Sequence, residues 1–363
     1  MKYLAFILPV VLAGAIVLVA AAEEPPAQGP ALRPISAARV DAALASLSLE
    51  DKLGQVLMSY PPLAKTGPVR VGGVVMVGNL LKDADKVRAR IQDLQARATV
   101  PLLIAADVEG GELNKLSFMP GLEHVPSARE LGQGSHAQAL AWGVAVGQGM
   151  GQLGLNVSLA PVLDLAGSGL MYESGRSYGA DPEHVASMGS AFAGGLAQAG
   201  VLSVGKHYPG YGDLSENTDF HLLVRDVSHE ALELEMSAFR QAGAALDGVM
   251  VGNVGYQIYG GKPAILCPEI VRMAHEQGWP TITDDLAIGT LAQATGDDPE
   301  QLFLAAFRAG NDILLTTAPP DWDKGIDYLG ILEAELRHDP TLLPSLDDRV
   351  RRVLGMKDRL GLL

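Results

Sequence analysis

Cysteine is nearly absent from this chain of 363 residues, which contains only Cys267. A disulfide framework or a cysteine metal cage needs several cysteines, so both are excluded. Cys267 lies in the run Ala-Ile-Leu-Cys-Pro, and we expect it to be a small buried hydrophobe. Positive charge is also scarce, because the formal net charge is −15. Such a balance disfavours a phosphate-backbone partner, and no nucleic-acid binding is expected.

Charged residues make up only 19% of the chain, whereas hydrophobic residues make up 48%. This composition supports a large apolar core and argues against disorder over most of the chain. The length would accommodate two average domains, but α/β barrels commonly exceed 250 residues as one unit. Length alone therefore leaves the number of domains open.

The first residues resemble a targeting signal. Lys2 precedes an apolar run from Leu4 to Ala20, and Ala20-Ala21-Ala22 forms a small-x-small site where a signal peptidase could cut. We expect residues 1–22 to be a signal peptide and the protein to be exported to the periplasm or the medium. An uncleaved membrane anchor is the alternative. Residues 23–36, which are rich in proline, are expected to form a linker.

Short apolar runs alternate with amphipathic segments through the rest of the chain, residues 37–363. Helical spacing of apolar residues occurs, for example, at Val87, Ile91 and Leu94 and again at Leu232, Met236 and Phe239. Eight runs are predicted to be strands: 56–60, 73–77, 102–106, 156–160, 202–206, 248–252, 280–283 and 312–316.

Continuous apolar strands that alternate with helices indicate a parallel sheet covered on both faces. Eight of them predict an α/β fold of the (β/α)8 barrel type as a single catalytic domain. An open doubly wound sheet is the alternative, but no Gly-x-Gly-x-x-Gly follows the early strands. A final helix is predicted after Pro344-Ser345, and we expect no second domain after the barrel.

Ionisable residues follow the predicted strands with unusual regularity. In barrels of this type the active site lies at the carboxyl ends of the strands. The residues in question are Asp107, Asp164, Lys206 with His207, Asp284 with Asp285, and Arg176 in the loop after the fourth strand. Carboxylates mixed with basic groups at one mouth can hydrogen-bond the hydroxyls of a neutral sugar. A small carbohydrate is therefore the expected substrate.

Two of these carboxylates, Asp164 and Asp285, are expected to form ion pairs that stabilise the rim. Asp284 is the better candidate for a reactive group, because glycosyl transfer with retention needs an ionised carboxylate at the anomeric carbon and a separate proton donor. His221 could be that donor. A metal site built on His207, His221, Asp107 and Asp284 is disfavoured, because closely spaced ligand pairs are missing, and we expect no cofactor. A Ser-His-Asp hydrolase that uses Ser215 is the weakest alternative.

The stretch Lys206–His221 is predicted to be a loop. Pro209, Gly210 and Gly212 supply fixed or positive φ, and polar turn formers follow. Asp219 and His221 could turn to the same side of an extended backbone and hydrogen-bond each other. Such a pair on a glycine-hinged loop is typical of a general acid/base, although an ordinary surface hydrogen bond is the alternative.

From about Leu47 to its end the chain resembles the family 3 glycoside hydrolases, and among them the single-domain β-N-acetylglucosaminidases. The ordered motifs that carry this resemblance are Leu49-Glu-Asp-Lys-Leu-Gly-Gln55, Asp107-Val-Glu-Gly-Gly111, Asn156-Val-Ser-Leu-Ala-Pro-Val-Leu-Asp164, Gly175-Arg-Ser-Tyr-Gly-Ala-Asp-Pro182, Lys206-His-Tyr-Pro-Gly-Tyr-Gly212, Asp219-Phe-His221 and Thr283-Asp-Asp-Leu286.

The resemblance implies a retaining double displacement. It assigns Asp284 as the nucleophile that forms a covalent glycosyl-enzyme and His221 as the acid/base, with Asp219 as its partner. It also implies that Asp107, Arg176, Lys206 and His207 hold the hydroxyls of the terminal sugar. The larger β-glucosidases of the family take their acid/base from an additional domain, so the Asp-x-His pair favours the N-acetylglucosaminidase branch.

The chain departs from the family pattern at several positions near these motifs. The loop between the Lys-His and Asp-x-His motifs is two residues longer than usual. Tyr211 and Asn253 occupy places where histidine is common, and Glu112 replaces a customary arginine. These changes leave Asp284 and the Asp219-His221 pair in place, and we expect them to affect leaving-group specificity.

Three hypotheses follow. The first is an exported monomer that removes terminal β-linked N-acetylglucosamine from cell-wall fragments or chitin oligosaccharides. It would meet a membrane only through an uncleaved anchor. The second is a β-glucosidase or a phosphorylase that passes the same covalent intermediate to phosphate. The third is a catalytically silent barrel that binds sugar or cell wall.

Overall fold

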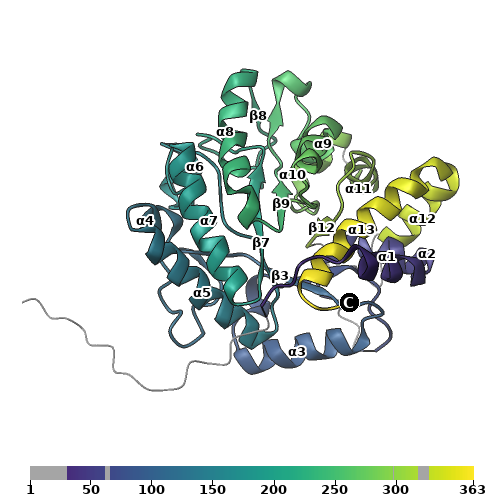
Figure 1. Ribbon diagram of the computed structural model, residues 1–363. Helices are drawn as coiled ribbons and strands as arrows, with labels where there is room; N and C mark the ends of the chain where they lie inside the picture. The colour runs from purple at the N-terminus through teal and green to yellow at the C-terminus, as the bar shows by residue number, and fades with distance from the viewer. Residues whose placement is uncertain (1–30, 62–65, 297, 318–326) are drawn as a thin grey trace, which may run out of the picture.

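The computed structural model describes residues 31–61, 66–296, 298–317 and 327–363. Within them, strands and helices alternate along the chain (Figure 1). Eight strands form one sheet in the order β11-β9-β7-β6-β3-β2-β1-β12, and every pair of neighbours is parallel. They are β1 Leu57–Ser59, β2 Gly73–Val75, β3 Leu103–Ala106, β6 Val157–Ser158, β7 Leu202–Tyr208, β9 Gly248–Val251, β11 Thr281–Thr283 and β12 Leu314–Thr316.

The sheet closes on itself where β11 meets β12. Ile282 forms a parallel bridge with Ile313. The backbone N–H of Thr283 donates to the Ile313 carbonyl at 2.9 Å, and the Ile313 N–H donates to the Thr281 carbonyl at 3.0 Å. The predicted (β/α)8 barrel is therefore confirmed, and each of the eight predicted strands is present.

The helices lie outside the strands and cover them (Figure 1). They are α1 Ala37–Ser46, α2 Leu49–Gln55, α3 Ala84–Arg97, α4 Ala128–Gly132, α5 His136–Leu153, α6 Gly169–Glu173, α7 Pro182–Gln198, α8 His229–Ala242, α9 Pro268–Glu276, α10 Gly289–Ala292, α11 Pro299–Arg308, α12 Tyr328–His338 and α13 Leu343–Arg359. Local sequence sets several of their starts: Ser135 and Gln138 form a capping box at α5, and Ser228 caps α8.

The core has two parts because barrel strands present alternate side chains inward and outward. Inward-facing side chains such as Met58, Leu103, Val204 and Ile282 fill the barrel and contact Val353 and Met356 of α13. That contact places α13 across the amino-terminal end of the barrel. The outward-facing side chains pack against the helices in a second, larger cluster. Side chains thus fill the barrel interior, and α13 covers its amino-terminal end. A ligand can therefore bind only at the opposite, carboxyl end of the strands.

The N-terminal segment before α1 is described from residue 31 onward. Residues 31–36 contain no helix or strand, but the Arg33 N–H donates to the Arg359 carbonyl at 2.8 Å and the Ser36 N–H to Asp358 Oδ2 at 2.6 Å. This part of the predicted linker is therefore fixed to α13. The predicted signal, residues 1–22, lies outside the described residues. Among the helices that are described, none combines the length and the apolar character needed to cross a bilayer.

Two small sheets lie in the loops that follow the barrel strands. β4 Val108–Gly110 and β5 Leu113–Asn114 form an antiparallel hairpin directly after β3. β8 Val224–Arg225 pairs in parallel with β10 Gly255–Tyr256, and so joins the end of the loop after β7 to the loop after β9. Both sheets therefore lie beyond the carboxyl ends of the barrel strands.

Candidate active site at the mouth of the barrel

A cavity of about 420 Å³ opens at the carboxyl ends of the barrel strands. This volume lies within the range typical of small-molecule sites. Its lining includes six of the seven residues that the sequence predicted for the site, namely Asp107, Arg176, Lys206, His207, Asp219 and Asp284. His221 does not line it. Apolar side chains such as Met76, Leu159 and Met250 complete the wall.

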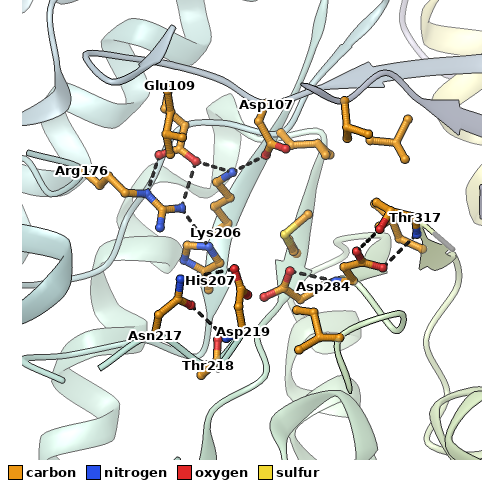
Figure 2. A pocket seen from close by; sticks show the side chains of 18 of the residues that line it. Asp107, Glu109, Arg176, Lys206, His207, Asn217, Thr218, Asp219, Asp284 and Thr317 are labelled. Carbon is orange, nitrogen blue, oxygen red and sulfur yellow. Dashed lines mark hydrogen bonds and ion pairs between the residues drawn. The ribbon is translucent and has the colours of Figure 1, made fainter. Parts of the chain in front are cut away.

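Charged side chains at the floor form one connected network (Figure 2). Lys206 Nζ lies 2.6 Å from Asp107 Oδ1 and 2.6 Å from Glu109 Oε1. Glu109 also accepts two hydrogen bonds from Arg176, at 2.7 Å from Nε and 2.9 Å from Nη2. Because each basic group is held by a carboxylate, the floor is preorganised before any ligand binds.

Glu109 is the centre of this network, and the sequence interpretation did not assign it a role. Its side chain is only 3% exposed. Burial alone would raise the pKa of Glu109, but the charges of Lys206 and Arg176 hold it well below its ordinary value. A signal was available, because Glu109 follows Asp107 by two residues and such residues share one face of an extended segment.

His207 is oriented by the buried Asp164. Asp164 Oδ2 accepts from His207 Nδ1 at 2.6 Å, and Asp164 Oδ1 accepts from the backbone N–H of Tyr211 at 2.8 Å. The other ring nitrogen, Nε2, faces Arg176 Nη2 at 3.3 Å. Asp164 and Arg176 thus contact both ring nitrogens of His207. Asp164 therefore supports the site from beneath and does not line the cavity.

Asp284 directly follows β11 and lies at the side of the cavity opposite Arg176 and Glu109 (Figure 2). Burial raises the pKa of Asp284, while His207, the Asp285 N–H and Lys206 oppose this and the charge of Asp219 adds to it. The neighbouring Asp285 also borders the cavity, but its carboxylate is engaged, accepting from the Thr317 N–H at 2.9 Å and from the Thr317 hydroxyl. Asp285 thus holds the ends of β11 and β12 together and leaves Asp284 as the reactive candidate.

The Asp219-His221 pair is not formed in this conformation. The N–H groups of Phe220 and His221 both donate to the Asn217 carbonyl, at 3.0 and 3.1 Å, so the segment is a tight turn. The prediction assumed an extended backbone, where residues two apart share a face; in a helical turn they do not. Asp219 consequently lines the cavity, whereas His221 Nε2 lies 3.6 Å from Glu216 on the outside.

The glycines of the predicted loop are required by close packing. Gly210 and Gly212 have φ values of 148° and 63°. A Cβ at Gly210 would collide with Glu235, and one at Gly212 with Arg225. Arg225 and Glu235 pair at 2.6 Å behind the loop. Both glycines therefore let the chain pass over this ion pair.

Alternative chemistries find little support at this mouth. The sequence Gly175-Arg-Ser-Tyr-Gly179 has the spacing of a serine nucleophile elbow, but the Ser177 hydroxyl is fully buried and donates to the Asp164 carbonyl at 2.8 Å. Ser215 lies in the loop and does not line the cavity. Within the described part of the chain, no group of three or more His, Cys, Asp or Glu residues could hold a metal ion.

Comparison with known proteins assigns this arrangement to a family. Residues 48–356 match the family described as Glycosyl hydrolase family 3 N terminal domain. A β-hexosaminidase of Alkalilimnicola ehrlichii is 31% identical over 300 residues, which cover 79% of this chain and 82% of that protein.

Solved structures agree with the sequence match. The chain resembles a crystal structure of β-N-acetylhexosaminidase from Beutenbergia cavernae with a TM-score of 0.77 and 31% identity, covering 86% of this chain and 99% of the other. A β-glucoside phosphorylase is similar in fold only, with a TM-score of 0.76 and 21% identity over 90% of this chain and 61% of the other.

Proposed function

Because the chain belongs to family 3 of the glycosyl hydrolases and is therefore a glycoside hydrolase, we propose that it removes terminal β-linked N-acetylglucosamine with retention of configuration. The proposed substrates are cell-wall fragments or chitooligosaccharides. The β-hexosaminidase names of the relatives at about 30% identity support this choice of sugar. The position of Asp284 carries the proposal for the reaction.

Asp284 suits the role of nucleophile because it faces the cavity and none of the described residues forms an ion pair with it. Its Oδ1 accepts a hydrogen bond from the backbone N–H of Asp285 at 2.8 Å. The remaining carboxylate oxygen is therefore available to a ligand. The groups proposed to bind the sugar are, in contrast, held in ion pairs: Lys206 pairs with Asp107 and Glu109, and Arg176 pairs with Glu109. These pairs fix the positions of donors and acceptors for the sugar hydroxyls.

The proposed reaction has two displacements. In the first, an Asp284 oxygen bonds to the anomeric carbon as the glycosidic bond breaks, and the leaving oxygen takes a proton from the acid. In the second, water gives a proton to the same group, now a base, and its oxygen replaces Asp284 at the anomeric carbon. The β-configuration is inverted twice and therefore retained.

His221 is the proposed acid/base, with Asp219 as its partner. In the observed turn His221 lies outside the cavity, so this role requires the side chain to move inward. Asp219 already lines the cavity, but His221 has to leave Glu216 and turn inward. Its side chain is 58% exposed, and its contact with Glu216 is long and solvated, so this contact costs little to break. A loop that moves during turnover would satisfy this requirement.

The test is hydrolysis of a chromogenic β-N-acetylglucosaminide, compared with the corresponding β-glucoside and repeated with added phosphate. We expect preference for the N-acetylated sugar and no sugar phosphate among the products. Proton NMR of the first product should show the β-anomer before mutarotation. An α-anomer would refute the double displacement, and preference for glucoside would refute the sugar assignment. Product profiles on purified muropeptides and chitobiose then separate the two substrate classes.

We also propose that the enzyme works outside the cytoplasm, because the apolar run Leu4–Ala20 and the small residues that follow it fit an export signal. Fractionation of cells that make the full chain tests this. Recovery of the intact, uncleaved protein in the cytoplasmic fraction would contradict export.

A further inference from the structure

Tyr211 links the floor of the cavity to the loop that carries Asp219 and His221. Its ring is buried, with 3% of the residue exposed, and it meets the His207 ring edge-on at 5.9 Å between centroids. Its backbone N–H donates to Asp164, the same carboxylate that orients His207. The position of Tyr211 is therefore fixed from the floor side.

The hydroxyl of Tyr211 reaches the loop from beneath. It donates to the Glu216 carbonyl at 2.8 Å and accepts from the Thr218 N–H at 3.0 Å. One hydroxyl thus satisfies backbone groups on both sides of Asn217. Thr218 is 4% exposed, so an unpaired N–H at this position would be costly.

The loop is bonded to the rest of the barrel up to Thr218, whereas the turn after Thr218 is held by bonds within the loop. On the near side, Asp213 Oδ1 accepts from the N–H groups of Gly167 and Ser168, and the Thr290 hydroxyl donates to the Thr218 carbonyl. Beyond Thr218, the turn is held by bonds to Asn217, which lies between the two groups that Tyr211 binds. The side chain of Phe220 points into solvent with 73% of the residue exposed.

From these contacts we infer that Tyr211 is a positioning residue, whose hydroxyl fixes residues 216–218 and thereby sets where Asp219 and His221 lie relative to Asp284. This inference rests on the proposed function only for its kinetic consequence. The structural part, that one hydroxyl holds the base of the turn, stands on the hydrogen bonds alone.

The test is Tyr211→Phe, which removes the hydroxyl and keeps the buried ring. Tyr208→Phe is the matched control. Tyr208 lies three residues earlier in β7 and is equally buried, but its hydroxyl contacts Met236 Sδ at 3.2 Å, away from the loop. Hydrogen exchange measured by mass spectrometry should be at least about fivefold faster for residues 213–223 in Tyr211→Phe and unchanged there in the control.

The kinetic arm uses a series of aryl glycosides with phenols of graded acidity. A misplaced proton donor harms the substrates that need protonation most. We expect Tyr211→Phe to lower kcat about tenfold for the least acidic phenol and less than twofold for the most acidic, with KM unchanged. Tyr208→Phe should match wild type across the series.

Two results would overturn the inference: unchanged exchange in residues 213–223, or an equal loss of kcat for every phenol, which would mean a merely structural role. The kinetic series uses whichever sugar the wild-type enzyme hydrolyses. An unexpected sugar preference would therefore refute the proposed substrate but leave the kinetic test of Tyr211 valid. The hydrogen-exchange measurement does not depend on activity.

Discussion

The floor of the cavity and the tip of the loop after β7 are constructed differently. At the floor, Glu109 and Lys206 are each 3% exposed in their side chains and share an ion pair of 2.6 Å. At the loop tip, the side chain of His221 is 58% exposed, and its Nε2 lies 3.6 Å from the carboxylate of Glu216. The first contact is short and shielded from solvent, and the second is long and solvated.

This difference separates two tasks of a glycosidase. Groups that recognise the sugar benefit from being fixed before binding, because no reorganisation is then needed in the reaction. A proton donor that also has to admit the substrate and water benefits from mobility. We therefore expect changes at the floor to affect all substrates and the fold itself, and changes at the loop tip to depend on the leaving group.

The largest effect is expected from Asp284→Asn, which removes the proposed nucleophile but keeps the shape of the side chain. Activity on the preferred glycoside should fall about 10⁴-fold or more. Because burial raises the pKa of Asp284, its ionisation lowers the stability of the fold as the pH rises through that pKa. The asparagine variant should therefore have a Tm at pH 7 equal to or above that of wild type. Activity near the wild-type level would refute the assignment.

Glu109→Gln tests whether the floor depends on its central carboxylate. Removing one partner of a buried ion pair leaves Arg176 and Lys206 undercompensated, and the free energy of unfolding at pH 7 should fall by about 3 kcal/mol. The pKa of Glu109 is held below its ordinary value of 4.5, so its stabilising effect is present above that pH and is lost as the pH falls. The difference in the free energy of unfolding between Glu109→Gln and wild type should therefore become smaller below about pH 4.5.

Urea denaturation between about pH 4 and pH 7 measures the free energy of unfolding of Glu109→Gln and wild type. Glu333→Gln is the control, because Glu333 pairs with Arg337 on the surface of α12, where both side chains are largely exposed. Its stability should match wild type. If Glu109→Gln were as stable as the control at pH 7, the floor would not depend on this carboxylate.

Lys206→Met tests the positive charge that the floor supplies to the substrate and to Asp284. Loss of the ammonium removes a donor to the sugar, and kcat/KM should fall about 100-fold. It also removes a positive charge that lowers the pKa of Asp284, so that pKa should rise further. The acid limb of the pH profile of kcat/KM should consequently move to higher pH. A limb that stays in place would show that Asp284 is not the group titrating there.

The smallest average effect is expected from His221→Ala at the loop tip. Glycosides with weakly acidic leaving groups should lose about 30-fold in kcat, and those with acidic phenols less than about threefold. His136→Ala, at the exposed start of α5, is the control and should match wild type. A uniform loss across all leaving groups would mean that His221 acts on binding or folding and not on proton transfer.

Much of this molecule could be predicted from local patterns. Runs such as Leu102–Ala106 and Gly248–Gly252 are apolar without alternation because their strands are covered on both faces. Asp107, Lys206 and Asp284 were placed at one mouth because parallel strands in a barrel end on the same side. The role of Glu109 was missed because its partners, Lys206 and Arg176, are far away in the sequence.

The sequence by itself determined which elements form, their order and direction, and so which residues gather at the mouth of the barrel. The tertiary structure decided the conformation of the segment 217–221, where Asp219 turns inward and His221 outward. The physical reason is that backbone groups of this loop are satisfied by Tyr211, Thr290 and Asn217, contacts that no local periodicity encodes.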